Sequence, residues 1–591
     1  MKKNTISLVV LLLLISCWTF AQEKKAKING ISTKNVAEKS SPITTKSKGL
    51  VHFNKVPNLT TNSYSLNNNS VKSAPYLGVN FAGNVCDGTT PPDNSIAISD
   101  NGYIVSVMNS NIEVYDNYGN YYMGGTFSDL IQDTSYTEDI HTPVVIYDSG
   151  YDRFILAALH GKTPSTSRVI LCFSKSNSPL YGWWFYDLPG NVLQNNTWMD
   201  FIRLGVSDNE IYITGNLYDV SGNFDQAIIY QIPKYVGYSG INLYWQYWYG
   251  IDDHPFTVVP ASYGRNGNYG PGILFVSHVA NNNTVSLYDL TDDMSGSPTI
   301  DLYSISTMPF SPPSNASQLG SNIILDNLDC RILSAFYLNG YVHYVFHSSN
   351  QGTSLSGINY NRIYLSILTN FSYEFGISGY NCSYPSVASY STSPSDKGVS
   401  ICFLRSGVSV YPEVMVVNCD DQHDWSSPLL VKQGNSYVEM DTLNGTTPWG
   451  MYTGITRQHT ASVPTVWVSG AFGNERFLDT TMVNCLDTWI AQITDSPVSI
   501  NPTSNSKIDF NLFPNPASEI WFSNITCKKK SFWQIDIQDV SGKYLRTVFM
   551  GDLSEGNHLL SFINDFNPGM YFVCFYEGSC SVGFQKLVIV K

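Results

Sequence analysis

Short apolar and aromatic runs, each ended by a turn, recur from residue 76 to about residue 495, and this recurrence constrains the fold more than any other feature. Ile96–Asn109 reads as an apolar run, a Ser-Asp-Asn turn and a second apolar run, and Leu204–Asn216 repeats that order. A looser copy has its turn at Ser395–Lys397. Asp-Asn and Asp-Gly turns between strands are typical of β-hairpins. The pattern therefore predicts a long series of hairpins.

The composition favours an all-β chain. Aromatic residues make up 14% of the sequence and include 39 Tyr, and they suit the pleated, half-buried surface of a strand. A propeller blade of four strands needs roughly 40–50 residues. The span of the hairpins therefore predicts a β-propeller of about seven blades, with six or eight also compatible with the long loops. The alternative is a pair of β-sandwiches.

The N-terminus carries the three parts of a secretory signal peptide. A positive end precedes the apolar run Ile6–Ile15, and small residues lead up to an expected cut between Ala21 and Gln22. The apolar run is too short to remain as a helix across a bilayer of about 30 Å. We therefore expect residues 1–21 to be removed on export. The alternative is a lipoprotein signal with its lipid on Cys17.

Charge is unevenly distributed along the chain, which has 33 Lys and Arg against 47 Asp and Glu. Residues 22–75 are rich in Lys, Ser and Asn with few large apolar side chains, and we expect a disordered or extended leader there. The acidic excess falls on the body, residues 76–495, which would repel nucleic-acid phosphates, so we expect no nucleic-acid partner. Calcium is the one cofactor that we consider, through acidic clusters. These clusters are Asp289, Asp292 and Asp293, and Asp420, Asp421 and Asp424.

Cysteine usage leaves several arrangements open. An exported chain meets conditions in which disulfides form. Cys172 and Cys402 lie in apolar runs and fit buried thiols, whereas Cys574 and Cys580 flank a turn and could pair. The number of cysteines is too large for the sequence to choose one pairing.

A Pro-, Ser- and Asn-rich linker at residues 496–506 separates the body from a tail at residues 507–591. The tail reads as a short series of strands and fits a small antiparallel β-sandwich. Its segments LFPNPASEIWF, DVSGKYL and NPGMYFVCFYEG resemble the type A C-terminal sorting domain of the type IX secretion system. This resemblance implies export by that machinery to the outer cell surface or the extracellular space, removal of the tail, and release or attachment to a surface polysaccharide. The matching positions are Pro514, Asn515, Pro516, Gly542, Gly569, Tyr571, Lys586 and Lys591.

The body resembles exported propellers that are described as sialidase-like in fold. The resemblance lies in three segments, Pro91–Asp116, Val144–Leu159 and Trp449–Ile493. In that group the last segment contains Arg-Trp-Gly-Asp-Tyr, but here Pro448 and Met451 replace the Arg and the Asp, which puts any role of those two charges in doubt. The resemblance leaves three candidate ligand-binding residues. They are Asp93, Trp449 and Tyr452.

Catalytic signatures are missing from the body. There is no zinc-protease His-Glu-x-x-His, no nucleophile elbow and no phosphate-binding glycine loop. A sialidase needs several Arg for the substrate carboxylate and a Tyr beside a carboxylate, and the repeated sialidase box is absent. We therefore expect a binding or adhesion protein for glycan or protein ligands, with a secreted glycosidase as the alternative. Asp-Thr motifs at Thr442 and Thr480 resemble acceptors for O-glycans.

Overall fold

The computed structural model describes residues 47–48, 52–53, 72–495 apart from 110, 134, 137, 279–282, 351–352 and 479–480, and 510–590 apart from 528, 540–543 and 578–579. The chain divides into two compact units, Met1–Pro497 and Val498–Lys591. The predicted signal peptide with its cut at Ala21 and Gln22, Cys17, most of the leader and the linker lie outside the described residues. So do Thr480, Gly542 and Lys591.

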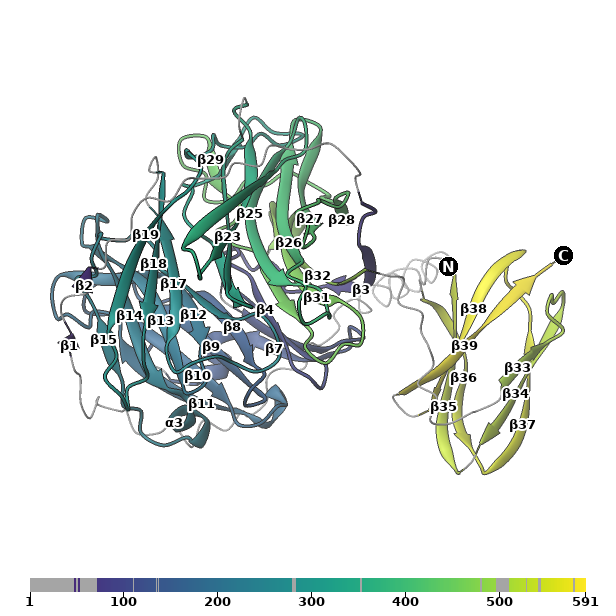
Figure 1. Ribbon diagram of the computed structural model, residues 1–591. Coiled ribbons are helices and arrows are strands. Elements are labelled where there is room, and N and C mark those ends of the chain that lie inside the picture. The colour runs from purple at the N-terminus through teal and green to yellow at the C-terminus, as the bar shows by residue number, and fades with distance from the viewer. Residues whose placement is uncertain are drawn as a thin grey trace, which may run out of the picture. The chain divides into compact units, whose positions relative to one another are not determined.

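Seven blades, each of four antiparallel strands, form a β-propeller in the described part of the first unit, which confirms the predicted fold (Figure 1). Blade 1 is β4 (Ser95–Ile98), β5 (Tyr103–Met108), β6 (Asn111–Asp116) and β7 (Tyr121–Thr126). Blade 2 is β8 (Ile140–Asp148), β9 (Arg153–His160), β10 (Arg168–Ser174) and β11 (Trp183–Pro189). Blade 3 is β12 (Thr197–Val206), β13 (Glu210–Asp219), β14 (Phe224–Pro233) and β15 (Gln246–Trp248). Blade 4 is β16 (Val259–Tyr263), β17 (Ile273–His278), β18 (Thr284–Leu290) and β19 (Ile300–Ser306).

The remaining blades continue the same order from the centre outward. Blade 5 is β21 (Ser334–Leu338), β22 (Tyr341–Ser349), β23 (Ser356–Tyr364) and β24 (Thr369–Phe375). Blade 6 is β25 (Asn381–Ser389), β26 (Val399–Gly407), β27 (Val410–Cys419) and β28 (Leu429–Lys432). Blade 7 is β30 (Gly454–Arg457), β31 (Thr465–Leu478), β32 (Thr481–Thr494) and β3 (Tyr76–Ala82).

Several short elements accompany the blades. β1 (Ser47–Lys48) pairs with β15, β2 (His52–Phe53) with β19, and β20 (Ile324–Asp326) with β29 (Thr446–Pro448), all in parallel. The helices α2 (Phe127–Ile131) and α3 (Lys234–Ser239) follow β7 and β14. The described residues contain no helix with the length and apolarity that crossing a membrane requires.

The ring closes by joining the two ends of the propeller sequence. β3 pairs antiparallel with β32, so the first strand of the body becomes the outer strand of the last blade. The inner strands β4, β8, β12, β16, β21, β25 and β30 each pack against the next, and β30 packs against β4. Where blades 4 and 5 meet, β16 and β21 form a short parallel ladder. Closure leaves no exposed inner edge on which another strand could add.

The middle strands explain why this sequence forms blades. β9 and β10 read as nearly continuous apolar runs and are buried on both faces, because a neighbouring blade covers each face. The outer strand β7 alternates between exposed and partly buried residues, since it faces solvent. Separate apolar clusters fill the spaces between blades 1 and 2, 3 and 4, 4 and 5, 5 and 6, and 7 and 1.

Inner-strand serines add hydrogen bonds between blades. Ser95 Oγ is 3.3 Å from the Val145 carbonyl oxygen and 3.2 Å from the Val145 backbone nitrogen, which links blades 1 and 2. Ser386 Oγ donates to the Thr453 carbonyl at 2.5 Å and links blades 6 and 7. These bonds satisfy polar groups that the close packing of inner strands would otherwise bury unpaired.

The second unit is the predicted small antiparallel sandwich. One sheet contains β33 (Phe510–Phe513), β34 (Ile520–Cys527) and β37 (Gly556–Ile563). The other contains β35 (Ser531–Asp539), β36 (Tyr544–Leu553), β38 (Gly569–Glu577) and β39 (Cys580–Ile589). Both sheets supply the core, with Trp521 from the first and Trp533 from the second fully buried. In the β38–β39 ladder Cys574 lies opposite Phe584 and Cys580 opposite Glu577, so the two cysteines are not cross-strand neighbours.

Candidate functional site

A cavity of about 230 Å³ occupies the centre of the propeller and is lined by the inner strands of all seven blades. Because β16 and β21 run parallel and every inner strand occupies the same place in its blade, all seven strands begin at the same end of this channel. We call that end the entry mouth.

Seven equivalent positions surround the entry mouth, each two residues before a residue that lines the cavity. Five of them adopt the left-handed backbone conformation, with φ between 44° and 65°, which is costly for residues other than glycine. Left-handed residues of this kind concentrate at functional sites, where the surrounding fold holds the strain. We call this set the mouth ring. It comprises Asp93, Thr142, Phe201, Thr257 and Tyr384, which are left-handed, and Arg331 and Tyr452.

Arg203 reaches across the channel just inside the mouth ring. It lies on β12, and its Nε donates a 3.2 Å hydrogen bond to the carbonyl of Leu333, two blades away. Its guanidinium carbon lies 4.1 Å from the centre of the Phe201 ring and 4.3 Å from that of Tyr452. Tyr452 in turn donates a 3.0 Å hydrogen bond from its hydroxyl to the Pro143 carbonyl of blade 2. Arg203 and Tyr452 therefore close one end of the cavity.

Burial perturbs the charges at the mouth. Asp93 is 2% exposed, and burial raises the pKa of its carboxyl to about 7, with a contribution from the nearby charge of Asp200. Its Oδ2 accepts a 3.0 Å hydrogen bond from Asn109. Burial also lowers the pKa of Arg203 to about 10. Arg331, by contrast, is neutralised by Asp329, whose Oδ1 and Oδ2 lie 2.8 and 3.0 Å from its Nε.

Several buried polar atoms around the mouth have no partner among the described residues. Native proteins pair most buried polar groups, so such a cluster indicates a place for a ligand or for ordered water. The atoms comprise acceptors and donors, so a ligand there meets both kinds of group. They are Asp93 Oδ1, Asn94 Oδ1, His141 Nε2, Arg203 Nη2 and Trp449 Nε1.

The structure places the three candidates from the sequence in different roles. Asp93 and Tyr452 belong to the mouth ring. Trp449 is fully buried, with its ring edge-on to Tyr384, so its faces are closed to a sugar. Arg203, Phe201 and Arg331 were not singled out by the sequence, and no shared residue type marks their positions.

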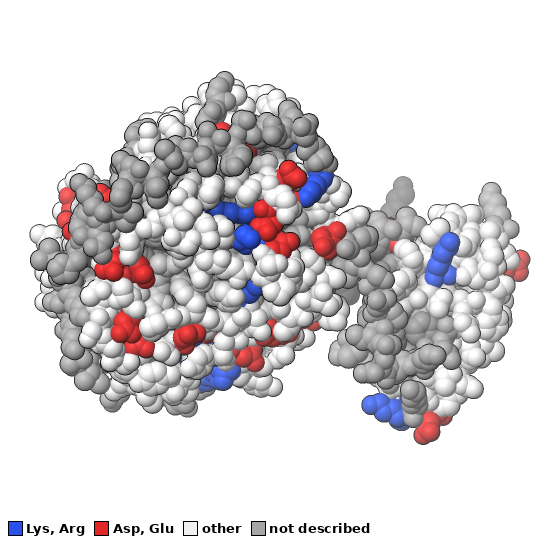
Figure 2. All heavy atoms as spheres, viewed as in Figure 1, with Lys and Arg blue, Asp and Glu red and all other residues white. Residues whose placement is uncertain are grey.

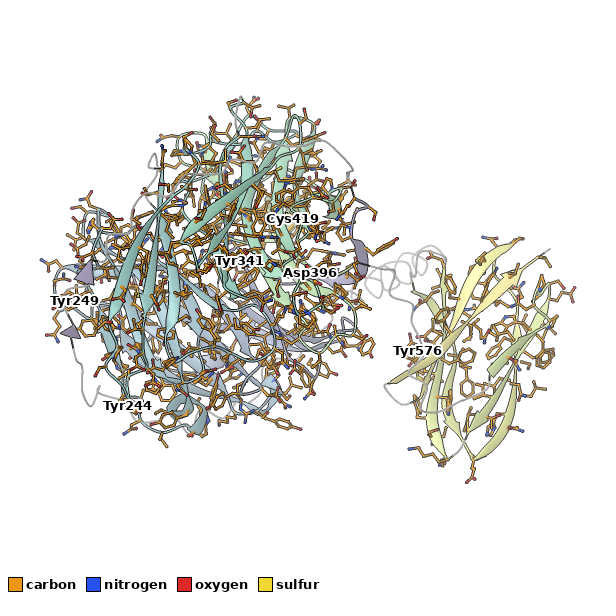
Figure 3. The ribbon with its side chains drawn as sticks, in the orientation of Figure 1. Tyr244, Tyr249, Tyr341, Asp396, Cys419 and Tyr576 are labelled. Carbon is orange, nitrogen blue, oxygen red and sulfur yellow. The ribbon has the colours of Figure 1, made fainter. Side chains whose placement is uncertain are left out.

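Four further tryptophans of the propeller offer little ring surface for stacking on a sugar. Trp183, Trp245 and Trp248 are buried, and Trp184 keeps only partial exposure beneath Lys175. Tyr244 and Tyr249 lie at the outer edge of the propeller in Figure 3, away from the channel, and both are partly exposed.

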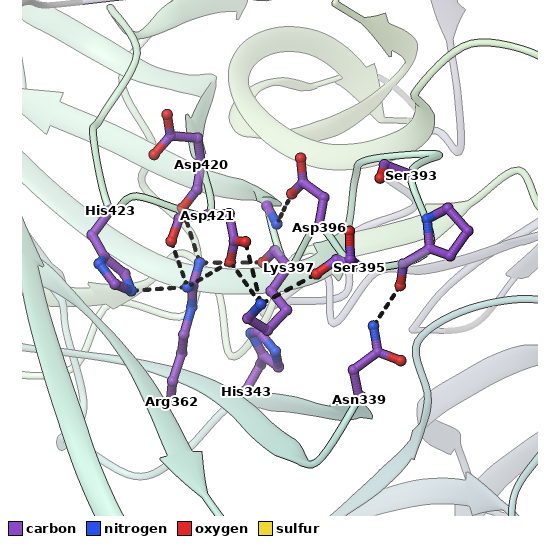
Figure 4. A network of polar contacts seen from close by, with 12 residues as sticks. Asn339, His343, Arg362, Ser393, Ser395, Asp396, Lys397, Asp420, Asp421 and His423 are labelled. Atoms are coloured by element: carbon purple, nitrogen blue, oxygen red, sulfur yellow. Dashed lines mark hydrogen bonds and ion pairs between the residues drawn. The ribbon is translucent and has the colours of Figure 1, made fainter.

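A second polar cluster joins blades 5 and 6 and is shown in Figure 4. Arg362 Nη1 lies 2.8 Å from His423 Nε2, and its Nη2 donates to the Asp420 carbonyl at 2.9 Å. Lys397 Nζ is 3.1 Å from Asp421 Oδ1. Because Arg362 and Lys397 both have carboxylate or carbonyl partners, this cluster stabilises the junction and offers no unpaired charge to a ligand. Figure 2 shows acidic and basic side chains close together near the middle of the propeller face in view.

The acidic clusters considered for calcium are engaged in the fold. Asp421 pairs with Arg362 and Lys397, and Asp293 accepts hydrogen bonds from Asn209 and Ser295. Over residues 72–495 and 510–590, within the gaps given above, no group of three or more His, Cys, Asp or Glu has a metal-binding arrangement. Thr442, one of the two acceptor positions considered for O-glycans, is exposed.

In the tail, the Pro-Asn-Pro motif is tied to the last strand. Asn515 Oδ1 accepts a 2.9 Å hydrogen bond from the Val588 backbone, and Asn515 Nδ2 donates to the Lys586 carbonyl at 2.5 Å. Residues 511–590 match the family described as secretion system C-terminal sorting domain. This segment is a type IX sorting domain. The protein is therefore exported to the cell surface or the extracellular space, and the sorting domain interacts with the type IX secretion machinery.

Solved structures similar to this chain include propellers and glycoside hydrolases. A protein of unknown function from Dyadobacter fermentans is 10% identical, with a TM-score of 0.34 over 72% of this chain and 100% of that chain. A family 43 arabinoxylan arabinofuranohydrolase from Bacillus subtilis is 10% identical, with a TM-score of 0.28 over 85% and 96%. An exo-β-1,3-galactanase from Clostridium thermocellum is 10% identical, with a TM-score of 0.27 over 87% and 92%. No curated protein matches the chain.

Proposed function

We propose that the exported propeller is a binding protein for an extracellular glycan or protein ligand, and that it receives an anionic group of that ligand at the mouth ring. The observation that carries this proposal is the buried Arg203, whose Nη2 has no partner in the described residues. A planar guanidinium binds a carboxylate through two parallel hydrogen bonds, and burial strengthens such bonds. An anion there would also offset the burial that disfavours the charged form of Arg203.

The Arg203 guanidinium is preorganised for such a contact. Its Nε bond to Leu333 and its place between the rings of Phe201 and Tyr452 fix the guanidinium before a ligand arrives. A group that is already ordered loses little conformational entropy on binding. The neighbouring Asp93, with its pKa near 7, can present a protonated carboxyl that donates a hydrogen bond to the same anion.

The acidic surface of the propeller modifies this recognition. The chain carries a net charge of −14, so an anionic ligand meets long-range repulsion before it reaches Arg203. That repulsion is screened over about 8 Å at physiological salt, whereas the buried contact is screened much less. We therefore expect association to become faster as salt is raised from low concentration, opposite to the behaviour of a basic binding surface.

The test uses protein recovered from the cell surface or culture fluid and an array of acidic and neutral glycans. We expect retention on carboxylate-bearing members, loss of it in Arg203→Met and partial recovery in Arg203→Lys. The matched control is Arg168→Met, since Arg168 is a half-exposed residue in a loose 3.9 Å pair with Asp187. Equal retention of neutral and acidic glycans, or unchanged retention by folded Arg203→Met, would contradict the proposal.

A secreted glycosidase remains the second candidate because of one observation. Asp93 has a pKa of about 7 and feels the charge of a second carboxylate, Asp200, and such a pair can divide the roles of general acid and base. Fluorogenic glycosides test this candidate. Turnover that disappears in Asp93→Asn, while Arg168→Met keeps it, would favour the enzyme over the binding protein.

Attachment to a surface polysaccharide after removal of the tail belongs to the same proposal, and digestion of that polysaccharide should release the protein from cells.

A further inference from the structure

Two buried cysteines meet where the propeller ring closes. β3 ends opposite Trp489 of β32, and the chain then continues beside β32 through the 3.0 Å bonds Gly83 N–H to Thr488 O and Thr488 N–H to Asn84 O. Cys86 follows, with its backbone N–H donating to Asp487 Oδ1 at 2.9 Å. This path brings Cys86 beside Cys485 of β32, where the two thiols interact, and Cys86 Sγ also lies 3.9 Å from Met440 Sδ.

We propose that Cys86 and Cys485 form a disulfide that covalently closes the ring of blades in the exported protein. Cys86 and Cys485 are 3% and 0% exposed, so the contact lies inside blade 7. The exported protein encounters oxidising conditions, in which neighbouring thiols can form a disulfide. Three other cysteines share blade 6, but in its ladders none of them lies opposite another. The remaining described cysteines lie in blade 2, in the segment before blade 5 and in the sorting domain.

The reaction is thiol–disulfide exchange with an external disulfide oxidant, such as an oxidised dithiol protein or oxidised glutathione. The Cys86 thiolate attacks one sulfur of the oxidant, which forms a mixed disulfide and releases one thiolate. The Cys485 thiolate then attacks the Cys86 sulfur and releases the second thiolate. Two electrons pass to the oxidant, and the two protons go to solvent. A hydrogen bond from Cys485 lowers the pKa of Cys86, which favours Cys86 as the first nucleophile.

The disulfide would stabilise both the closure of the propeller ring in blade 7 and the loop at the entry mouth. It spans almost the whole body, from the segment after β3 to the last strand β32. Cross-links that close long loops restrict the unfolded chain most. The same segment continues from Cys86 to Asp93 of the mouth ring, and Thr90 Oγ1 on the way donates to the Pro448 carbonyl at 3.3 Å. The disulfide would therefore anchor the base of the loop that carries Asp93.

The test uses full-length protein exported by its own host, denatured without reductant, alkylated and digested. We expect one cross-linked peptide pair that contains Cys86 and Cys485 and separates on reduction. In thermal unfolding, reductant should lower Tm by several degrees, and the double variant Cys86→Ala/Cys485→Ala should show no such shift. Cys330→Ala, a buried cysteine in the segment before blade 5, is the matched control and should keep the shift. Alkylation of both Cys86 and Cys485 before reduction, or a Tm that reductant leaves unchanged, would overturn the proposal.

Discussion

Arg362 Nη1 donates a hydrogen bond of 2.8 Å to Nε2 of His423, so the imidazole must stay neutral for blades 5 and 6 to keep this contact. Burial and the positive charge of Arg362 lower the pKa of His423 to about 4. Burial likewise lowers the pKa of three other histidines to about 4. They are His141, His278 and His459.

The lowered pKa values of these histidines predict that the folded protein loses stability in mild acid. The unfolded chain binds protons at these histidines near pH 6.5, whereas the folded protein does not until about pH 4. The stabilisation is therefore complete above pH 6.5 and falls as the pH drops toward 4. We expect His423→Gln, which keeps an acceptor for Arg362, to reduce the pH dependence of the unfolding free energy by roughly 1–3 kcal/mol across that window. Urea unfolding at pH 7, 5.5 and 4.5 measures this pH dependence, and His558→Gln in the sorting domain is the control. If the unfolding free energy varied equally with pH in both variants, His423 would not be a source of the acid sensitivity.

For Asp93 the predicted pH dependence of stability has the opposite sign. Its folded pKa of about 7 exceeds the ordinary value of 3.8, so the free energy of unfolding falls as the pH rises from 4 to 7. Above pH 7 this loss of stability is complete. Asp93→Asn should therefore leave stability nearly unchanged at pH 4.5 but raise it at pH 8, by a few kcal/mol at about 1.4 kcal/mol per pKa unit. Denaturant titrations at the two pH values test this. A variant that is destabilised equally at both would show that Asp93 is ionised without cost. Under the proposed function the same variant loses ligand, as expected where a binding site is held at the expense of stability.

The fold was predictable because its signals are local. Turn residues and apolar runs repeat in each blade, and an additional repeat was present at Asp116–Asn120 and Asp219–Asn223. Both share Asp-x-x-Gly-Asn, and in each the Asp Oδ1 accepts two backbone N–H bonds across a hairpin. The motif marks a hairpin between the third and fourth strands of blade 1 and between the second and third strands of blade 3, so it predicts hairpins and not the blade period.

The site was only partly predictable because the mouth ring is defined by position and not by residue type. Its members include an Asp, two Thr, a Phe, an Arg and two Tyr, and a left-handed backbone has no fixed sequence signature outside Gly, Asn and Asp. Asp93 and Tyr452 came from the resemblance of their segments. Arg203 meets Leu333 only after closure of the ring brings blades 3 and 5 together, and such long-range contacts leave no local pattern.

Tyr452 bridges blades 7 and 2 through its bond to the Pro143 carbonyl. Tyr452→Phe keeps the ring against Arg203 but leaves that buried carbonyl unpaired, which costs about 1–3 kcal/mol. We expect the midpoint of urea unfolding to fall with an unchanged slope. Tyr181→Phe is the matched control, because Tyr181 is 77% exposed, and should change stability by less than about 0.5 kcal/mol. Equal effects of the two substitutions would show that the bond across the channel does not contribute.

In the sorting domain, Asn515 fastens the Pro-Asn-Pro turn to β39 by bonds to the backbone of both Lys586 and Val588. Asn515→Ala removes both bonds and exposes the end of the last strand to fraying, so we expect the secretion machinery to lose a structured terminus and the protein to accumulate in the periplasm. Cell fractionation with immunoblotting of the propeller measures the exported fraction, and deletion of residues 511–591 sets the full defect. Asn524→Ala on the exposed face of β34 is the control and should be exported normally. Normal export of Asn515→Ala beside failure of the deletion would show that the turn's attachment to β39 is not what the machinery requires.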